Sequence, residues 1–178
     1  MDIQNFKIDS TQSNIRWTGR KITGEHYGNI GIKEGHILFE NGFLKSGKVS
    51  VDTRSISILD ITDKETNTQF AGHLASDDFF GSEAFPEAIF EIMTAEPAGS
   101  GQYHIDGNLT IKGITHPMVA TLEVTIADEQ VNLKTLLAVD RTKYNMKFRS
   151  GNFFANLGDT LIYNLFDLNI QLQATAEH

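Results

Sequence analysis

The sequence lacks cysteine altogether and has only three prolines in 178 residues. Without cysteine the chain can form no disulfide, no thiolate nucleophile and no cysteine-based zinc site. It also has no apolar run longer than a few residues, so no segment is long enough to span a bilayer as a helix. These absences exclude several enzyme and membrane-protein classes, although they say little about the compartment.

Positive charge is also scarce, because 15 lysines and arginines face 23 acidic residues and leave a net charge of −8. A chain this acidic, with no basic run, repels nucleic acid and anionic membrane surfaces, so we expect neither as a partner. The first residues, Met1 to Asn5, show neither the basic nor the apolar region of a signal peptide. We therefore expect a cytoplasmic protein, or a periplasmic one if a leader has been removed.

What the sequence does contain is apolar and aromatic side chains with a period of two. Twelve phenylalanines need a substantial interior, and 178 residues suit one domain over 1–178. The segments 102–112, 118–126 and 162–173 alternate apolar and polar residues, which is typical of half-buried strands. At least eight such segments, joined mostly by short turns, predict an antiparallel barrel or sandwich.

One stretch, between Thr53 and Pro86, breaks this alternation. Thr62 and Glu65 fit a capping box, and Phe70 and Leu74 fall on one helical face, so we predict a short helix from Asp63 to Leu74. The sequence Ser76-Asp77-Asp78 fits a second N-cap followed by a turn.

Several blocks of sequence, in conserved order from residue 6 to residue 173, resemble the YceI lipocalin-like family. The pattern W-x-G-x-K-x-x-G-x-H-x-G spans Trp17–Gly28, and the others are GHLASDDFF from Gly72, Phe85-Pro86, GNLTIKGIT from Gly107, DRTKYN from Asp140 and Leu157-Gly158-Asp159. The chain departs from the family pattern at Phe85, where tyrosine is usual, and at Asn164-Leu165, which is often acidic.

The resemblance implies an all-β fold, an eight-stranded antiparallel lipocalin-like barrel with one short helix between strands. It also implies a non-catalytic protein that binds or transports a polyisoprenoid, a quinone or a fatty-acid-like lipid in an elongated apolar interior. Such a lipid is the partner that we expect, with no other cofactor.

The candidate ligand-binding residues are the inward-facing apolar side chains of the predicted strands. Alternation alone cannot distinguish the lining of a tunnel from a packed core, but the family resemblance favours a lining. These residues are Trp17, Phe39, Phe90, Tyr103, Leu122, Val124, Phe166 and Leu168. His26, Arg141 and Arg149 are possible contacts for a polar head group, or else ordinary exposed strand residues.

Two other functions compete with lipid binding. His73, Asp77 and Asp78 could form a metal-dependent hydrolytic site, although their spacing fits helix capping and turn formation better. Alternatively, a barrel with a solid core could act through its outer surface in a stress response, as a homodimer. We expect no catalytic residue and no metal site.

Overall fold

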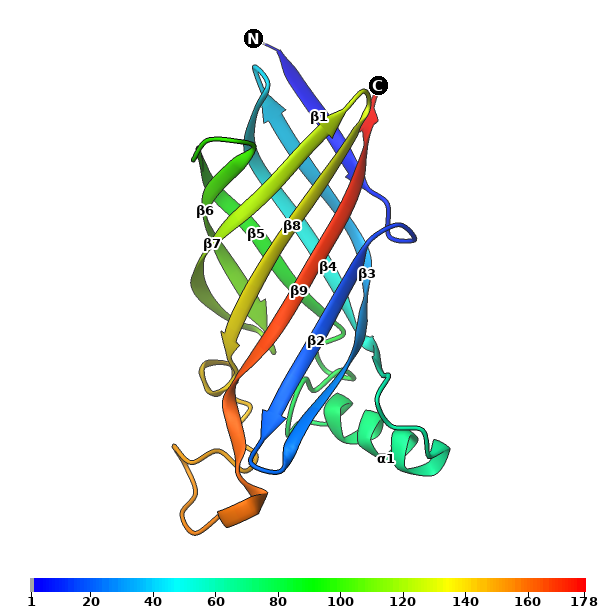
Figure 1. The fold of residues 1–178 in the computed structure, drawn as a ribbon, viewed down its shortest axis with the longest axis vertical. Helices are drawn as coiled ribbons and strands as arrows, with labels where there is room; N and C mark the ends of the chain where they lie inside the picture. The colour runs from blue at the N-terminus through cyan, green and yellow to red at the C-terminus, as the bar shows by residue number, and fades with distance from the viewer. Residues whose placement is uncertain (1) are drawn as a thin grey trace.

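The computed structural model describes residues 2–178 and consists mainly of antiparallel strands, with one α-helix (Figure 1). The strands are β1 (Ile3–Ile8), β2 (Asn14–Lys21), β3 (Gly24–Glu40), β4 (Phe43–Ile58), β5 (Glu87–Pro97), β6 (Gln102–Ile111), β7 (Ile114–Ala127), β8 (Gln130–Asp140) and β9 (Ile162–Glu177). The helix α1 (Lys64–Ala75) follows β4, and two short 3₁₀ turns, η1 (Arg141–Tyr144) and η2 (Gly158–Thr160), lie between β8 and β9.

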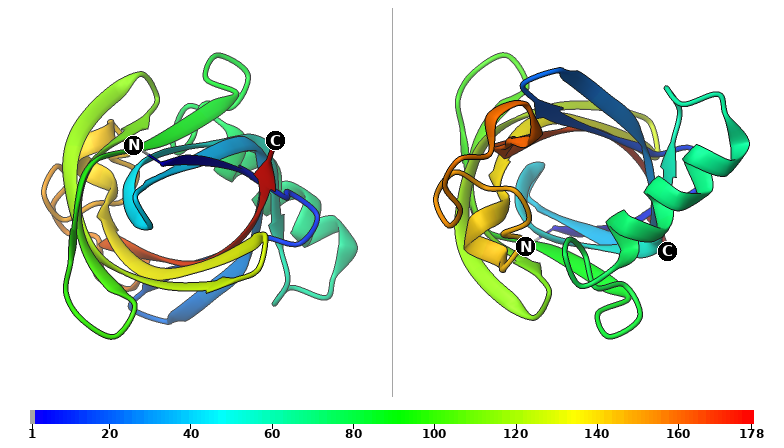
Figure 2. Two further views of the ribbon diagram at one scale, coloured as in Figure 1. Left: turned by 90° about the horizontal axis from the view of Figure 1, so that it is seen from above. Right: turned by 90° about the horizontal axis from the view of Figure 1, so that it is seen from below.

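These nine segments occupy eight positions in a closed barrel (Figure 2). Both β1 and β2 pair with β3 on one side and β9 on the other, so they form a single strand position interrupted at residues 9–13. From there each strand pairs with its neighbour in the order β9, β8, β7, β6, β5 and β4, and β4 pairs with β3 to complete the circle. The predicted eight-stranded antiparallel barrel is therefore confirmed.

The ladder between β3 and β4 is the longest and the most irregular. Its register shifts at three places, between Asn29 and Gly31, between Ile32 and Glu34, and between Leu38 and Phe39. Such bulges bend a strand and increase its twist, which lets these long strands follow the curve of the barrel. Gly28 is essential to the close approach, because a Cβ atom there would overlap the carbonyl of Ser57 on β4.

The two ends of the barrel differ in packing. Both chain termini lie at one end, which we call the closed end (top of Figure 1), where Phe6 packs edge-on against Phe39 with ring centroids 5.3 Å apart. The Tyr103 hydroxyl there accepts a hydrogen bond from the Leu44 N–H at 3.2 Å. The opposite end, which we call the mouth, carries α1 and the long connection between β8 and β9. The closed end is a solid core, so any internal space lies toward the mouth.

The wall is incomplete between β7 and β8, along a stretch that we call the seam. Their ladder contains five pairs, from Ala127–Gln130 to Glu123–Lys134. Toward the mouth the strands separate, with a hydrogen bond from the Thr135 hydroxyl to the Thr121 carbonyl at 2.9 Å. At the mouth end of the seam, His116 donates to the carbonyl of Lys143 in η1 at 2.9 Å.

The short helix predicted before Pro86 is present as α1. Its N-cap is Asp63 rather than Thr62, because the Asp63 carboxylate accepts the Thr66 N–H at 3.0 Å. The turn predicted after Ser76 is present, and the Ser76 hydroxyl accepts the Asp78 N–H at 3.3 Å, but no second helix begins there. Ser76 also ends α1, and its hydroxyl donates to the His73 carbonyl at 2.6 Å. Among residues 2–178, no helix combines the length and apolar character needed to cross a lipid bilayer.

The contact at Gly28 gives a direct test of how the barrel closes. Gly28→Ala forces the β3 and β4 backbones apart, and we expect the free energy of unfolding to fall by about 1–3 kcal/mol. Gly72→Ala is the matched control, because it lies in α1 with no atom within 4 Å of the added methyl group. This control should raise stability by about 0.5–1 kcal/mol through helix propensity. Urea denaturation measures both, and an unchanged Gly28→Ala protein would contradict the close approach.

Candidate functional site

The interior contains two adjoining apolar cavities between the mouth and the middle of the barrel. The mouth cavity has a volume of about 330 Å³ and the inner cavity about 90 Å³. Four side chains, Trp17, Ile56, Phe80 and Phe166, line both cavities and form a neck between them. The rings of Phe80 and Phe166 meet edge-to-face there, with centroids 6.3 Å apart. The two cavities are thus separated by aromatic side chains that line both of them.

Trp17 occupies the neck because of the backbone geometry at Gly28. The two residues are paired across β2 and β3, and the absence of a side chain at Gly28 lets the Ser57 carbonyl of β4 come close. The Trp17 indole N–H donates to that carbonyl at 3.1 Å. The ring is therefore held in one orientation, with its polar atom satisfied and its apolar face toward the cavities.

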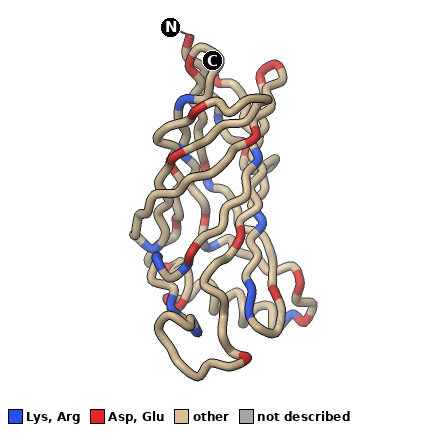
Figure 3. The backbone as a smooth tube through the Cα atoms, turned by 60° about the vertical axis from the view of Figure 1, so that its left-hand side comes forward, with Lys and Arg blue, Asp and Glu red and all other residues tan. Residues whose placement is uncertain are grey.

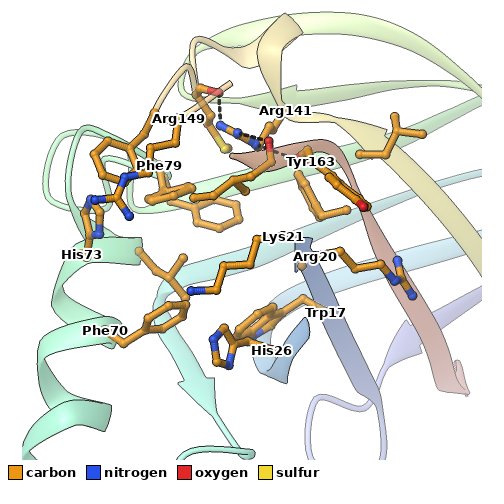
Figure 4. A pocket seen from close by; sticks show the side chains of 18 of the residues that line it. Trp17, Arg20, Lys21, His26, Phe70, His73, Phe79, Arg141, Arg149 and Tyr163 are labelled. Atoms are coloured by element: carbon orange, nitrogen blue, oxygen red, sulfur yellow. Dashed lines mark hydrogen bonds between the residues drawn. The ribbon is translucent and has the colours of Figure 1, made fainter. Parts of the chain in front are cut away.

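The mouth is covered by α1 and the turn that follows it, which carry Phe70, Leu74, Phe79 and Phe80 over the cavity (Figure 4). The buried ammonium of Lys112 fixes this cover by donating to the Asp77 carbonyl at 2.5 Å and to the Asn145 carbonyl at 3.1 Å. Two separate loops at the rim are therefore joined by one lysine.

Arg141 is the most deeply buried cation at the mouth, with 2% of its surface exposed. Its guanidinium donates to the carbonyls of Tyr163 at 3.0 Å, Ile162 at 3.0 Å and Met146 at 2.6 Å. Burial lowers the pKa of Arg141 to about 10, against the opposing effect of Asp140, so the group remains charged at neutral pH. Arg141 thus joins the start of β9 to the loop after η1 and places a fixed positive charge beside the cavity.

Other basic side chains lie around the same rim. Arg20, Lys21, His26 and Arg149 all line the mouth cavity. Arg20 is paired with Asp167 at 2.6 Å and Glu25 at 3.3 Å. Within the described chain, no carboxylate forms an ion pair with Lys21 or Arg149. The rim therefore has free positive charge directed at an otherwise apolar cavity.

His26 connects the rim to the segment before α1. Its Nδ1 lies 2.7 Å from the Asp60 carboxylate, and its ring packs against Phe70 with centroids 5.0 Å apart. Burial alone would raise the pKa of Asp60, but hydrogen bonds from the Tyr27 N–H and from His26 lower it. Asp60 is therefore an anion at neutral pH and holds His26 against the cover.

The predicted ligand-binding residues separate into two groups. Trp17 and Phe166 form the neck, and Phe90, Leu122 and Leu168 line the inner cavity. Phe39, Tyr103 and Val124 are buried in the core but do not line either cavity. The three predicted head-group contacts, His26, Arg141 and Arg149, all line the mouth cavity, on its opposite sides (Figure 4).

The alternative hydrolytic cluster does not converge on one point. His73 lies 2.9 Å from Asp78, with its ring edge-on to Phe79 and Phe148. The side chain of Asp77 is 91% exposed and lies 3.4 Å from the ammonium of Lys112. Between residues 2 and 178 no group of three histidine, aspartate or glutamate side chains could hold a metal ion.

Several residues of the mouth cavity were not among the predicted site residues. Phe70, Leu74, Phe79, Phe80 and Phe148 lie on α1 and the loops, where no strand alternation points to them. The available signal was their concentration: three of these four aromatics fall in the one stretch, between Thr53 and Pro86, that interrupts the alternating pattern. A run of aromatics outside the strands of a barrel sequence indicates a cover over one end.

Known proteins are similar to this chain in sequence. A family model described as the YceI-like domain matches residues 6–174. A UPF0312 protein of Photorhabdus laumondii is 32% identical over 98 residues, which cover 55% of this chain and 48% of that protein. A UPF0312 protein of Shewanella baltica is 34% identical over 73 residues, 41% of this chain and 36% of that protein. The matched part thus spans about half the length of these curated relatives, or less.

Solved structures share the fold along nearly the whole chain. BcnA of Burkholderia cenocepacia superposes with a TM-score of 0.74 at 20% identity, covering 94% of this chain and 99% of that one. A polyisoprenoid binding domain from Saccharophagus degradans gives a TM-score of 0.71 at 11% identity, covering 97% and 98%. At such identities the likeness shows the barrel architecture.

The role of Arg141 as an anchor can be measured separately from any ligand. Arg141→Met keeps the apolar length of the side chain but leaves three carbonyls without their donor. We expect a loss of about 2–4 kcal/mol in the free energy of unfolding. Arg149→Met changes an exposed cation on the same rim and should alter stability by less than about 0.5 kcal/mol. Equal stability of Arg141→Met and the wild type in urea would show that the loops are held by other contacts.

Proposed function

The chain belongs to the YceI-like domain family, and from this premise we propose that it binds a long apolar ligand, an isoprenoid or similar lipid, inside the barrel. The observation that carries the proposal is the alignment of two apolar cavities, a mouth cavity of about 330 Å³ and an inner cavity, which adjoin at an aromatic neck. Such a volume lies within the range of small-molecule sites, and an apolar cavity of this kind does not fill readily with water. The polyisoprenoid binding domain that shares the fold supports the same class of ligand.

The distribution of charge favours one orientation of the ligand, with its head group at the rim and its tail inside the barrel. The rim carries the cations Lys21, Arg141 and Arg149, whereas the inner cavity is lined almost entirely by apolar side chains. A polar or anionic head group at the rim satisfies those cations by charge-assisted hydrogen bonds, and the tail then extends past Trp17 and Phe166. A head group bound at the rim also leaves no polar atom in the inner cavity, where it would lack a partner.

Side chains at the neck would have to move for a ligand to enter the inner cavity. The inner cavity of about 90 Å³ is far smaller than a typical ligand site. Phe80, Phe90 and Phe166 are only partly buried, so their rings have space in which to rotate. A ligand tail that displaces these rings makes apolar contacts with them, which replace the contacts that the rings make with each other in the empty barrel. The same contacts favour a long chain over a short one, because binding free energy grows by roughly 0.3 kcal/mol per heavy atom for large ligands.

The solid-core and hydrolytic alternatives receive less support. A core packed along its whole length would leave no path from the rim to the middle of the barrel. A hydrolytic site at His73 would need Asp77 and Asp78 beside it, whereas Asp77 turns toward Lys112. A binding role accounts for the apolar path and the cationic rim together.

The decisive experiment is organic extraction of the purified protein followed by mass spectrometry, with a titration of Trp17 emission by a long-chain prenyl quinone. We expect a long-chain lipid in the extract and quenching of Trp17, which is the only tryptophan and lines the neck. Gly19→Phe should block loading, because a side chain there meets only the edge of Trp17, at 3.9 Å, before it grows into the mouth cavity.

Val119→Phe is the matched control, since Val119 is 72% exposed on the outer wall and lines neither cavity. It should extract and quench like the wild type, and both variants should keep the wild-type circular dichroism spectrum. A folded wild-type protein that extracts clean and shows no quenching would refute the proposal. Equal loading of the two variants would indicate that the ligand binds to another part of the molecule.

A further inference from the structure

The connection between β8 and β9 extends beyond the barrel at the mouth as a distal loop, residues 150–161 (Figure 1). It presents two adjacent aromatic side chains, Phe153 and Phe154, which are 47% and 51% exposed. The loop base is fixed, because the buried Ser150 hydroxyl donates to the Asn164 amide oxygen at 2.6 Å and the Ser150 carbonyl accepts both phenylalanine N–H groups. The two rings are about half exposed and line neither cavity.

A third apolar side chain stands beside this loop. Ile22, in the turn between β2 and β3, is 51% exposed. Its N–H donates to the carbonyl of Leu161 at the end of the distal loop, at 3.4 Å. We call Ile22, Phe153 and Phe154 the apolar tip. Exposed apolar groups gathered at one end of a molecule, on two linked loops, are typical of an interaction surface.

The charge around the apolar tip is opposite to that of the protein as a whole. The segment 141–161 contains four cations, Arg141, Lys143, Lys147 and Arg149, and one acid, Asp159, in a chain with a net charge of −8. The Lys147 ammonium lies 4.9 Å from the centroid of the Phe153 ring. Figure 3 shows lysine and arginine positions gathered where this segment leaves the barrel. Lys147 therefore lies directly beside the apolar tip, and Lys143 and Arg149 are exposed on the same segment.

We propose that the apolar tip docks on an anionic lipid surface. Phenyl rings that enter the boundary between head groups and acyl chains lose their contact with water, and nearby lysines meet lipid phosphates. A second copy of the chain fits this surface poorly, because a two-fold contact through the tip would bring Lys143, Lys147 and Arg149 against their own copies. The sequence-based expectation of repulsion from anionic membranes uses net charge, whereas docking at close range depends on the local charge at the tip.

Docking in this orientation brings the mouth cavity to the membrane, since the distal loop and the rim belong to the same end of the barrel. This inference goes beyond the proposed ligand, and its test is independent of it. Neither Phe153, Phe154, Lys143 nor Lys147 lines a cavity, so their replacement leaves lipid extraction unchanged whether or not the tip docks.

The test is co-sedimentation of the full chain with vesicles of phosphatidylcholine alone or mixed with phosphatidylglycerol. We expect binding to the mixed vesicles, weaker binding to phosphatidylcholine, and loss of binding at high salt. The double variant Phe153→Ser with Phe154→Ser should reduce partitioning at least about tenfold. Lys143→Gln with Lys147→Gln should reduce it by about fivefold for each lysine, from about 1 kcal/mol per basic residue near the surface.

Matched controls use residues of the same type elsewhere on the barrel. Val119→Ser with Leu136→Ser removes two apolar side chains that are 72% and 73% exposed on the wall, and Lys7→Gln with Lys134→Gln removes two exposed cations. Both control variants should bind like the wild type. Absence of wild-type binding to the mixed vesicles, or equal losses in tip and control variants, would overturn the proposal. Self-association through the tip, seen by sedimentation, would assign the surface to a second copy instead.

A second measurement does not require removal of the aromatic residues. The chain contains no cysteine, so Ala155→Cys and Glu129→Cys each accept one environment-sensitive fluorophore. Ala155 lies in the distal loop, and Glu129 lies in the turn between β7 and β8 at the closed end. Mixed vesicles should shift the emission of the label at residue 155 to shorter wavelength and leave the label at residue 129 unchanged. Equal responses from both labels would contradict docking through the mouth.

Discussion

The ladder between β3 and β4 closes the barrel, and the internal cavities exist because that ladder fixes the circumference of the wall. Strands linked by hydrogen bonds on both sides cannot move inward without breaking those bonds, so side chains must fill the interior or leave it empty. At the closed end Phe6, Phe39 and Tyr103 fill it. Toward the mouth the available side chains do not reach across, and the space remains. Gly28 is critical because it permits the approach of β4 and also leaves the Ser57 carbonyl free to hold Trp17.

Two buried cations hold the loops at the mouth in place. Lys112 and Arg141 each bind backbone carbonyls from separate segments. Lys112 also lies 3.4 Å from the exposed Asp77 carboxylate, whereas the hydrogen-bond acceptors around Arg141 are all neutral carbonyls. The contacts that fix Arg141 therefore leave its positive charge at the mouth, in a protein whose net charge is negative.

Much of the fold could be predicted from the sequence because a strand with one buried face has a period of two. The alternation over residues 102–112, 118–126 and 162–173 lies within or closely overlaps β6, β7 and β9. The interruption of the first strand position could not be predicted, since β1 and β2 are each regular and only their shared neighbours reveal that they form one position.

The site was harder to predict than the fold, for a physical reason. Phe39 and Phe166 both face inward, and whether such a residue meets solid core or open cavity depends on what stands across the barrel from it. The head-group candidates His26, Arg141 and Arg149 came from charge in strands that are otherwise poor in charge, and all three lie at the rim. The aromatic cover at Phe70, Phe79 and Phe148 has no periodic signal, because a helix and irregular loops carry it.

At the seam between β7 and β8 fewer hydrogen bonds hold the wall together than a complete ladder would provide. Beyond Glu123 and Lys134 no hydrogen-bonded pairs hold these two strands side by side, and the flanking side chains Thr135 and Leu137 also line the inner cavity. Widening the barrel along this line therefore breaks few contacts, chiefly those made by Thr135 and His116. A wider interior would therefore cost the fewest hydrogen bonds along this one side of the cylinder.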